Sequence, residues 1–507
     1  MSKSVKAVVD TRWGKIQGSY EDGIYVFKGI PYAAPPVGER RWLPPAPVEP
    51  WAGVRPALNF GPVAPQNRMA KRLMINGFDV VEPQSEDCLF SNIYSPGTDG
   101  ARRPVLFWIH GGAFAIGSGS SPMYYGRIMA SRGDVVVVTI NYRLGPLGFL
   151  NLNEVTGGRI PATGNEGLLD QIAAIKWVKE NNAAFGGDPE NVTVFGESAG
   201  GMSIGCLMAM PQARGLFRKA ILESGVGSTA VPLDSAVQIS GELGKTIGLA
   251  PDDVKAWRSL TAEQLLSAQQ KMLMGGTPGG QRKITVTAPV IDGKVFPKPA
   301  IDAIREGSAD DVSAIIGCNL EEIKLFAMIN PAPPVRDEAG LIRVMQASMP
   351  AEVARRTVEA YRNARGKRGD DTSPAEILSA IQTDLMFRIP GILVAEAQSC
   401  YNPRTYSYLF TWKSPLPGLG ACHVLEIGFV FGTHDAVFCG TGPKVDQLSR
   451  NIQDAWIAFA RTGDPSHPGI PKWEQYTVDK RSTMILDVPC RVEADPYREE
   501  LNAWKGI

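Results

Sequence analysis

Residues 192–201, VTVFGESAGG, combine a strand, a tight turn and the start of a helix. The β-branched and aromatic residues 192–195 predict a buried strand that runs directly into the pattern G-x-S-x-G, formed by Gly196, Ser198 and Gly200. A strand-to-helix turn this tight leaves no room for side chains two residues before or after the serine, and it leaves the serine hydroxyl projecting. The segment therefore predicts a nucleophilic serine at the end of a strand.

The same succession of short apolar strands and helices recurs along the chain. Residues 105–109 (VLFWI) run into His110-Gly-Gly, and residues 135–140 (VVVVTI) run into Asn141. Apolar residues at helical spacing in 165–179 predict a helix that crosses over before strand 192–195. Strands that alternate with helices favour an α/β fold with a mostly parallel central sheet flanked by helices.

The chain shows no repeat, charge run or low-complexity linker that would divide it. Its length would suit about three domains of ordinary size, but large α/β enzymes often exceed this rule. We predict one catalytic domain, residues 1–507, with helical cap insertions at about 230–290 and 330–400. The irregular segments 61–85 and 265–285 are expected to form pocket walls together with the second insertion; the Gly-rich KMLMGGTPGGQRK within 265–285 predicts a loop.

Composition excludes several classes of partner. The chain has 52 Lys plus Arg and 52 Asp plus Glu, so the net charge is zero and no global field attracts nucleic acid or anionic lipid. Uninterrupted apolar runs fall far short of the roughly 20 residues that a membrane helix needs. We therefore expect neither a nucleic-acid partner nor a membrane span.

The cysteines and the first residues bear on location. Seven cysteines, an odd number without a C-x-x-C pair, favour reduced thiols over a disulfide framework or a zinc site. The N-terminal MSKSVKAVVDTRWGK has no apolar stretch typical of a secretory signal. We expect a cytoplasmic protein. No H-E-x-x-H or phosphate-loop pattern occurs, so we expect no metal and no cofactor.

A second glycine motif, HGGAF, directly follows the strand 105–109. Acyl transfer passes through a tetrahedral oxyanion, and backbone N–H groups must point at it. Small residues let the chain approach closely enough, which makes Gly112, Ala113 and Ala199 the candidate donors. The alternative is a plain turn at the end of a strand.

Several further motifs occur in order along nearly the whole length: residues 27–38 (FKGIPYAAPPVG), 85–92 (SEDCLFSN), 141–149 (NYRLGPLGF), 164–171 (GNEGLLDQ) and 456–465 (WIAFARTGDP). Together with the serine motif they resemble the type-B carboxylesterase family of α/β hydrolases, which includes cholinesterases and bacterial p-nitrobenzyl esterases. The resemblance implies an α/β-hydrolase fold and a monomeric serine esterase that acts on small-molecule esters. In secreted members the cysteine of the second motif pairs with an upstream cysteine. No cysteine precedes Cys88, which is therefore expected to be a free thiol.

The nucleophile needs a base that is neutral near physiological pH, and the chain has four histidines. His110 belongs to the glycine motif, and His467 lies in a polar turn that we expect at the surface. His423 lies in residues 420–432 (GACHVLEIGFVFG), which resemble the segment around the family's catalytic histidine. His434 is the alternative, and an ordinary loop histidine is the more frequent role for such a residue.

In this fold the acid that orients the histidine falls between serine and histidine in chain order. Glu322 follows the predicted strand 312–317 and resembles the family's catalytic glutamate. Glu321 is adjacent, and only the register of the family motif selects Glu322. We expect Glu321 to face solvent or to cap a helix.

Two further residues resemble positions near the family's active site. Glu197 precedes the nucleophile and borders the site in relatives, and Ser224 resembles a serine that supports the catalytic acid. Ordinary packing or capping at the end of the sheet would explain both equally well.

These residues indicate ester hydrolysis through an acyl-enzyme on Ser198, with His423 as base and Glu322 as its acid partner. The resemblance implies short to medium acyl chains and aromatic or alkyl alcohols. The same triad could act mainly on carbamates or amides. A binding or adhesion protein is disfavoured by the intact triad, and a lipase would need an exposed apolar lid that the sequence does not clearly show.

Overall fold

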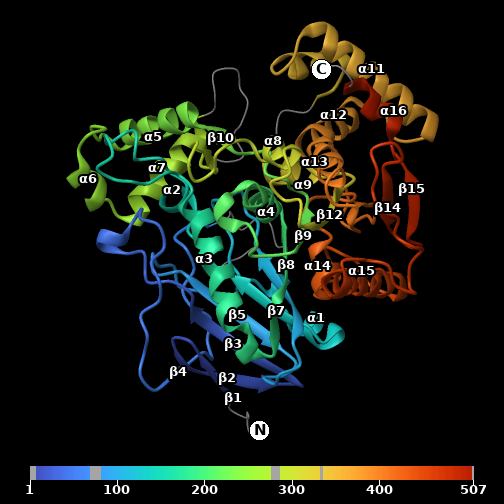
Figure 1. Cartoon of the computed structure of the whole chain (residues 1–507). Helices are drawn as coiled ribbons and strands as arrows, with labels where there is room; N and C mark the ends of the chain where they lie inside the picture. Colours follow the sequence, from blue (N-terminus) through green and yellow to red (C-terminus); the bar gives the residue numbers. More distant parts are fainter. Residues whose placement is uncertain (1–6, 69–81, 276–285, 332–334, 505–507) are drawn as a thin grey trace.

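The computed structural model describes residues 7–68, 82–275, 286–331 and 335–504 (Figure 1). Its centre is a 13-stranded sheet. Across the sheet the strands are β1 (Ala7–Thr11), β2 (Gly14–Glu21), β3 (Ile24–Pro31), β5 (Phe90–Ser95), β7 (Val136–Ile140), β6 (Arg103–Ile109), β8 (Gly187–Glu197), β9 (Lys219–Glu223), β12 (Ser313–Asn319), β13 (Thr405–Phe410), β14 (Ser482–Leu486) and β15 (Arg491–Ala494), while β4 (Val54–Pro56) pairs with β2.

Neighbouring strands from β7 to β14 run parallel. The pairs along both margins are antiparallel, except that β4 pairs parallel with β2. All residues of β6 and β7 are buried, as expected for parallel strands covered on both faces. The predicted α/β-hydrolase fold, with a mostly parallel sheet flanked by helices, is confirmed. The main helices around the sheet are α1 (Arg127–Gly133), α3 (Glu166–Asn181), α4 (Ala199–Ala209), α8 (Ala300–Arg305), α9 (Ile323–Ile329), α14 (Ile427–Phe431) and α15 (Pro443–Thr462).

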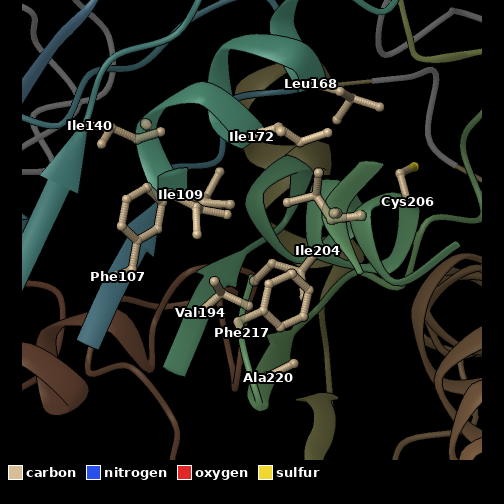
Figure 2. Close-up of a cluster of buried hydrophobic side chains, with 14 of the residues drawn as sticks. Phe107, Ile109, Ile140, Leu168, Ile172, Val194, Ile204, Cys206, Phe217 and Ala220 are labelled. Carbon is tan, nitrogen blue, oxygen red and sulfur yellow. The ribbon is translucent and has the colours of Figure 1, made fainter. Parts of the chain in front are cut away.

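Alternate residues of β6 build two cores, because successive strand side chains point to opposite faces. On one face, Phe107 and Ile109 share a buried cluster with Leu168 and Ile172 of α3 and Ile204 of α4 (Figure 2). This packing fixes α4, and with it the turn that leads into α4, against the middle of the sheet.

The opposite face is covered by α1, α14 and α15. Leu106 and Trp108 of β6 belong to a second buried cluster with Met129, Phe431 and Trp456. The Trp108 and Phe431 rings meet edge to face with centroids 5.0 Å apart. The sheet is thus enclosed between two helical layers.

The two segments predicted as insertions are mostly helical. The helices of the first share a buried cluster with Trp42 and Leu147, and those of the second share one with Ala503. The first carries α5 (Leu233–Ile247), α6 (Val254–Ser259) and α7 (Ala262–Met274), and the second carries α10 (Glu338–Gln346), α11 (Ala351–Arg368), α12 (Pro374–Thr383) and α13 (Ile389–Ser399). Helices α5–α7 (green) lie at the upper left of Figure 1, and α11 and α12 (orange) at the upper right. The loop prediction for 271–283 is wrong at its start, because α7 continues to Met274. Residues 69–81 and 276–285 of the predicted pocket walls lie outside the described residues.

The continuous helical segment Pro374–Ser399 is long and apolar enough, by length and composition, to cross a membrane. Charged and polar residues interrupt the segment, so it contains no long uninterrupted apolar run and was not predicted. In the fold α13 packs against β12 and α8, and the turn between α12 and α13 buries an ion pair of 2.8 Å between Arg388 and Asp384. In this fold 39% of the most apolar window of the segment is buried, so the segment packs on the fold through part of its surface.

Candidate active site

Ser198 lies in the turn between β8 and α4, with φ 55° and ψ −123°. This conformation is rare for a residue with a side chain and is typical of a serine held at a sharp strand-to-helix turn. The Ser198 N–H donates to the Glu223 carbonyl on the neighbouring strand at 2.9 Å. A Cβ atom at Gly200 would lie 2.0 Å from the Ile109 carbonyl oxygen, so only glycine fits there. The predicted turn is therefore present, and its glycine has the predicted steric reason.

His423 and Glu322 are brought together from segments 101 residues apart. His423 Nδ1 lies 2.6 Å from Glu322 Oε2, and the two residues are 3% and 0% exposed. Glu322 Oε1 also accepts the backbone N–H of Asn319 at 2.7 Å. A carboxylate held on Nδ1 fixes the imidazole orientation and leaves Nε2 to exchange protons.

Glu197 lies on the other side of the imidazole, with Oε1 3.2 Å from His423 Nε2. Burial, followed by repulsion from Glu426 and Glu322, holds the pKa of Glu197 well above its usual range. The protonated form of Glu197 is therefore favoured beside Nε2. Among the described residues Ser198 Oγ has no hydrogen-bond partner; catalytic hydrogen bonds of unliganded enzymes are often long and tighten only around the substrate.

Two aromatic rings that the sequence analysis missed lie on the imidazole. The ring centroids of Phe326 and Phe387 are 4.8 Å and 5.0 Å from that of His423. Phe326 lies on α9, one helical turn after Glu322, a spacing that the sequence does contain. Phe387 lies in a π-helical turn, Asp384–Arg388, and apolar periodicity gives no signal for such a turn.

The predicted oxyanion donors lie beside the nucleophile turn. A Cβ atom at Gly111 would lie 3.0 Å from Ser198 Cβ, which places the glycine loop next to the serine. Neither Gly112 nor Ala113 donates its N–H to a backbone carbonyl within the described part of the chain. Ala199 opens α4, and the first amides of a helix have no partner within it. The three N–H groups are thus available to a substrate oxygen.

We expect Gly112→Ala to lower kcat for p-nitrophenyl butyrate by about 10²-fold, the usual effect of losing one oxyanion donor. Gly112 has φ +108°, and a Cβ atom there would lie 2.1 Å from the Ile116 carbonyl oxygen, so the loop must move. The control is Gly100→Ala, where nothing lies within 4 Å of the added atom. A Gly112→Ala enzyme as active as the control would remove this loop from the oxyanion site.

Further buried acids lie behind the histidine, and one prediction is corrected there. Ser224 Oγ donates to Glu426 Oε1 at 3.4 Å, so it supports Glu426 and not the predicted acid Glu322. Glu426 lies three residues after His423, is 1% exposed, and has a pKa held well above its usual range by burial and then by repulsion from Glu322. Glu426 was not predicted as a site residue, because an acid on an apolar helical segment resembles an ordinary surface residue.

The prediction that Glu321 faces solvent is also corrected. Its side chain is only 16% exposed, forms an ion pair of 2.6 Å with Lys324, and accepts the Ala421 N–H at 2.8 Å. It therefore fastens the loop before His423 and does not face solvent.

Glu223 predicts a pH dependence of stability. Burial raises its pKa to about 8, while Trp456 Nε1 donates to its Oε1 at 2.8 Å. The folded chain keeps a proton that the unfolded chain releases above its ordinary pKa of 4.5, so this contribution to stability is complete below about pH 4.5 and is lost as pH rises through about 8.

We expect the free energy of unfolding of Glu223→Gln minus that of wild type to increase by about 4 kcal/mol between roughly pH 5 and pH 9, so that the variant becomes relatively more stable as pH rises. Urea unfolding at several pH values measures this difference. A difference that is independent of pH would show that Glu223 is ionised in the folded state.

The remaining histidines lie outside this cluster. His434, the alternative base, lines a surface cavity of about 690 Å³ between α1 and α15, with Nε2 3.2 Å from Asp446. His110 is fully buried with its ring stacked on Tyr142, and burial lowers its pKa to about 4. His467 is half-buried, with Nε2 3.0 Å from the Asn451 carbonyl oxygen.

The structure describes all seven cysteines. All seven cysteines are unpaired, and Cys88 is buried as a free thiol, as predicted. No group of three or more His, Cys, Asp or Glu side chains in the described chain is placed to hold a metal ion.

Comparison with known proteins agrees with the motifs. Residues 5–504 match the model of the carboxylesterase family. The chain is 39% identical over 500 residues to the para-nitrobenzyl esterase of Bacillus subtilis (strain 168), covering 97% of each chain. It is 35% identical to the phenmedipham hydrolase of Pseudarthrobacter oxydans, covering 95% of each. Among solved structures, the carboxylesterase EST55 of Geobacillus stearothermophilus matches with a TM-score of 0.87 at 39% identity, covering 98% of this chain and 100% of that chain.

Proposed function

Because this chain belongs to the carboxylesterase family and is a carboxylic ester hydrolase, we propose that it cleaves esters through an acyl-enzyme on Ser198. The observation that carries the proposal is the 2.6 Å contact between His423 Nδ1 and Glu322 Oε2 beside the strained serine turn. These are the groups that a serine hydrolase needs, and one chain supplies all of them, which supports action as a monomer.

In the acylation step, His423 Nε2 takes the proton of Ser198 as Oγ attacks the ester carbonyl carbon. The N–H groups of Gly112, Ala113 and Ala199 donate to the oxyanion of the tetrahedral intermediate. Glu322 stabilises the imidazolium that forms. The imidazolium then gives its proton to the alcohol oxygen, the bond between carbonyl carbon and alcohol oxygen breaks, and the acyl group stays on Ser198.

Deacylation repeats these steps with water. His423 removes a proton from the water molecule as its oxygen attacks the acyl carbon. The second tetrahedral intermediate collapses, Ser198 recovers its proton from His423, and the carboxylic acid leaves. The residues supply all proton transfers, so the reaction needs no cofactor.

We place the preferred substrates among esters of short to medium acyl chains with aromatic or alkyl alcohols. The similarity to a para-nitrobenzyl esterase supports an aromatic alcohol, and the rings of Phe326 and Phe387 supply apolar surface beside His423. The seven unpaired cysteines support a reducing, cytoplasmic location.

Hydrolysis of p-nitrophenyl acetate, butyrate and octanoate, with and without a metal chelator, tests this function. We expect chelator-independent release of p-nitrophenol with a maximum at one acyl length. Matched p-nitrophenyl carbamate and p-nitroanilide substrates are measured alongside. Faster turnover of either would favour the carbamate or amide alternative, and activity that the chelator abolishes would contradict the proposed chemistry.

A further inference from the structure

Asn319 ends strand β12 and is completely buried beside the candidate triad. Its backbone N–H donates to Glu322 Oε1 at 2.7 Å. Its side-chain Nδ2 donates to the Cys422 carbonyl oxygen at 2.7 Å and to Glu426 Oε2 at 2.5 Å. One residue therefore holds the acid of the triad and the residue immediately before His423.

These bonds join two segments that the chain itself does not connect closely. Glu322 begins α9 directly after β12, whereas His423 lies in the loop after β13. The backbone adds a bond of 2.9 Å from the Glu321 N–H to the Ala421 carbonyl oxygen and a longer one of 3.4 Å from the His423 N–H to the Glu322 carbonyl oxygen. The Glu321 side chain also accepts the Ala421 N–H at 2.8 Å. The Asn319 side chain adds a link directly before His423, because it holds the carbonyl group of Cys422.

The chemistry of this site favours asparagine over its isosteres. Both Nδ2 contacts need a donor, and a carboxylate in its place would add another acid beside Glu426 and Glu322. The Asn319 Oδ1 atom, in contrast, is buried without a hydrogen-bond partner. A buried acceptor without a partner destabilises the folded state, so stability alone does not explain an asparagine at this position.

We propose that Asn319 is a positioning residue for catalysis, which sets the Glu322–His423 geometry by fastening Cys422 and Glu322 to the end of β12. The inference rests on the proposed function, since it concerns the same triad. It predicts that loss of the amide slows the chemical step and leaves substrate binding almost unchanged, because Asn319 makes its contacts behind the catalytic groups.

The test uses Asn319→Ala, which removes the side-chain bonds and keeps the backbone bond to Glu322, and the near-isosteric Asn319→Asp. The matched control is Asn165→Ala, because Asn165 is equally buried and also joins two segments, through bonds of 2.8 Å and 2.9 Å to Val290. All variants are assayed with p-nitrophenyl butyrate, and their melting temperatures are compared. Asn319→Ala is also made in a Glu322→Gln background.

We expect Asn319→Ala to lower kcat about tenfold with KM within about twofold, as for a small misplacement of catalytic groups. Asn319→Asp should lose at least as much, and Asn165→Ala should keep kcat within about twofold. In the Glu322→Gln background, where the acid no longer holds the imidazole in the same way, the further loss from Asn319→Ala should fall below about threefold. A structural role alone would give equal losses in both backgrounds.

Two results would overturn the inference: a folded Asn319→Ala enzyme with the kcat of wild type, or equal losses in the two backgrounds. If the alanine variant does not fold, Asn319→Asp is compared with wild type instead. If neither variant folds, Asn319 is required for folding, and the inference is also overturned. The wild-type enzyme reports on the proposed function in the same assay. Its inactivity on every ester would refute that function, whereas active wild type with an unaffected Asn319→Ala variant would refute only this inference.

Discussion

Ser198→Ala is expected to lower kcat for p-nitrophenyl butyrate by about 10⁴-fold or more, because the alanine side chain cannot form the acyl bond. The residual rate would come from substrate binding and the N–H groups of Gly112, Ala113 and Ala199. Stopped assays over hours, with the melting temperature as a check on folding, measure the loss.

Ser203→Ala is the matched control for this variant. Ser203 is a buried serine on α4, the helix that begins after Ser198, and its Oγ donates to the Ala199 carbonyl oxygen at 2.8 Å. We expect it to keep kcat within about tenfold, since it lies one turn beyond the nucleophile. Equal losses at Ser198 and Ser203 would indicate a packing effect and would contradict nucleophilic catalysis by Ser198.

His423→Ala is expected to cost about as much as Ser198→Ala, and the double variant should be little worse than either one. Residues that act as a unit lose their combined effect when any one of them is removed. The kcat values of the two single variants and the double variant, taken together, measure this non-additivity.

His434→Ala serves as the control for the histidine, because His434 lies in the separate cavity beside Asp446. It should retain wild-type activity. Two results would show that His423 is not the base. One is losses that add on a logarithmic scale in the Ser198→Ala/His423→Ala double variant, and the other is a large loss in His434→Ala.

Local sequence was sufficient to predict the strands around the nucleophile and the turn at Ser198. Their residues carry the steric requirement themselves: β6 and β7 are continuous apolar runs, and the glycine at 200 is needed because the Ile109 carbonyl lies so close. Such features depend on neighbours in the chain or on an adjacent strand, so a pattern of residue types can predict them.

The proposed partners of Ser198 could not be predicted from local sequence patterns. His423 and Glu322 meet across 101 residues, and only the resemblance to a family selected them. The family resemblance suggested that Ser224 supports the catalytic acid, yet tertiary packing directs its hydroxyl to Glu426. Phe387 reaches His423 through a π-helical turn, a small departure from helical register that leaves no mark on apolar periodicity.

The most direct test of the account is the chemical identity of the intermediate. The wild-type enzyme is mixed with excess p-nitrophenyl acetate, quenched in acid within the first turnover, digested and analysed by mass spectrometry. We predict one acetyl group on the peptide that contains Ser198, lost on longer incubation and absent from Ser198→Ala. Turnover without any acylated peptide, or an acetyl group that is released at the catalytic rate from another residue, would contradict the acyl-enzyme mechanism.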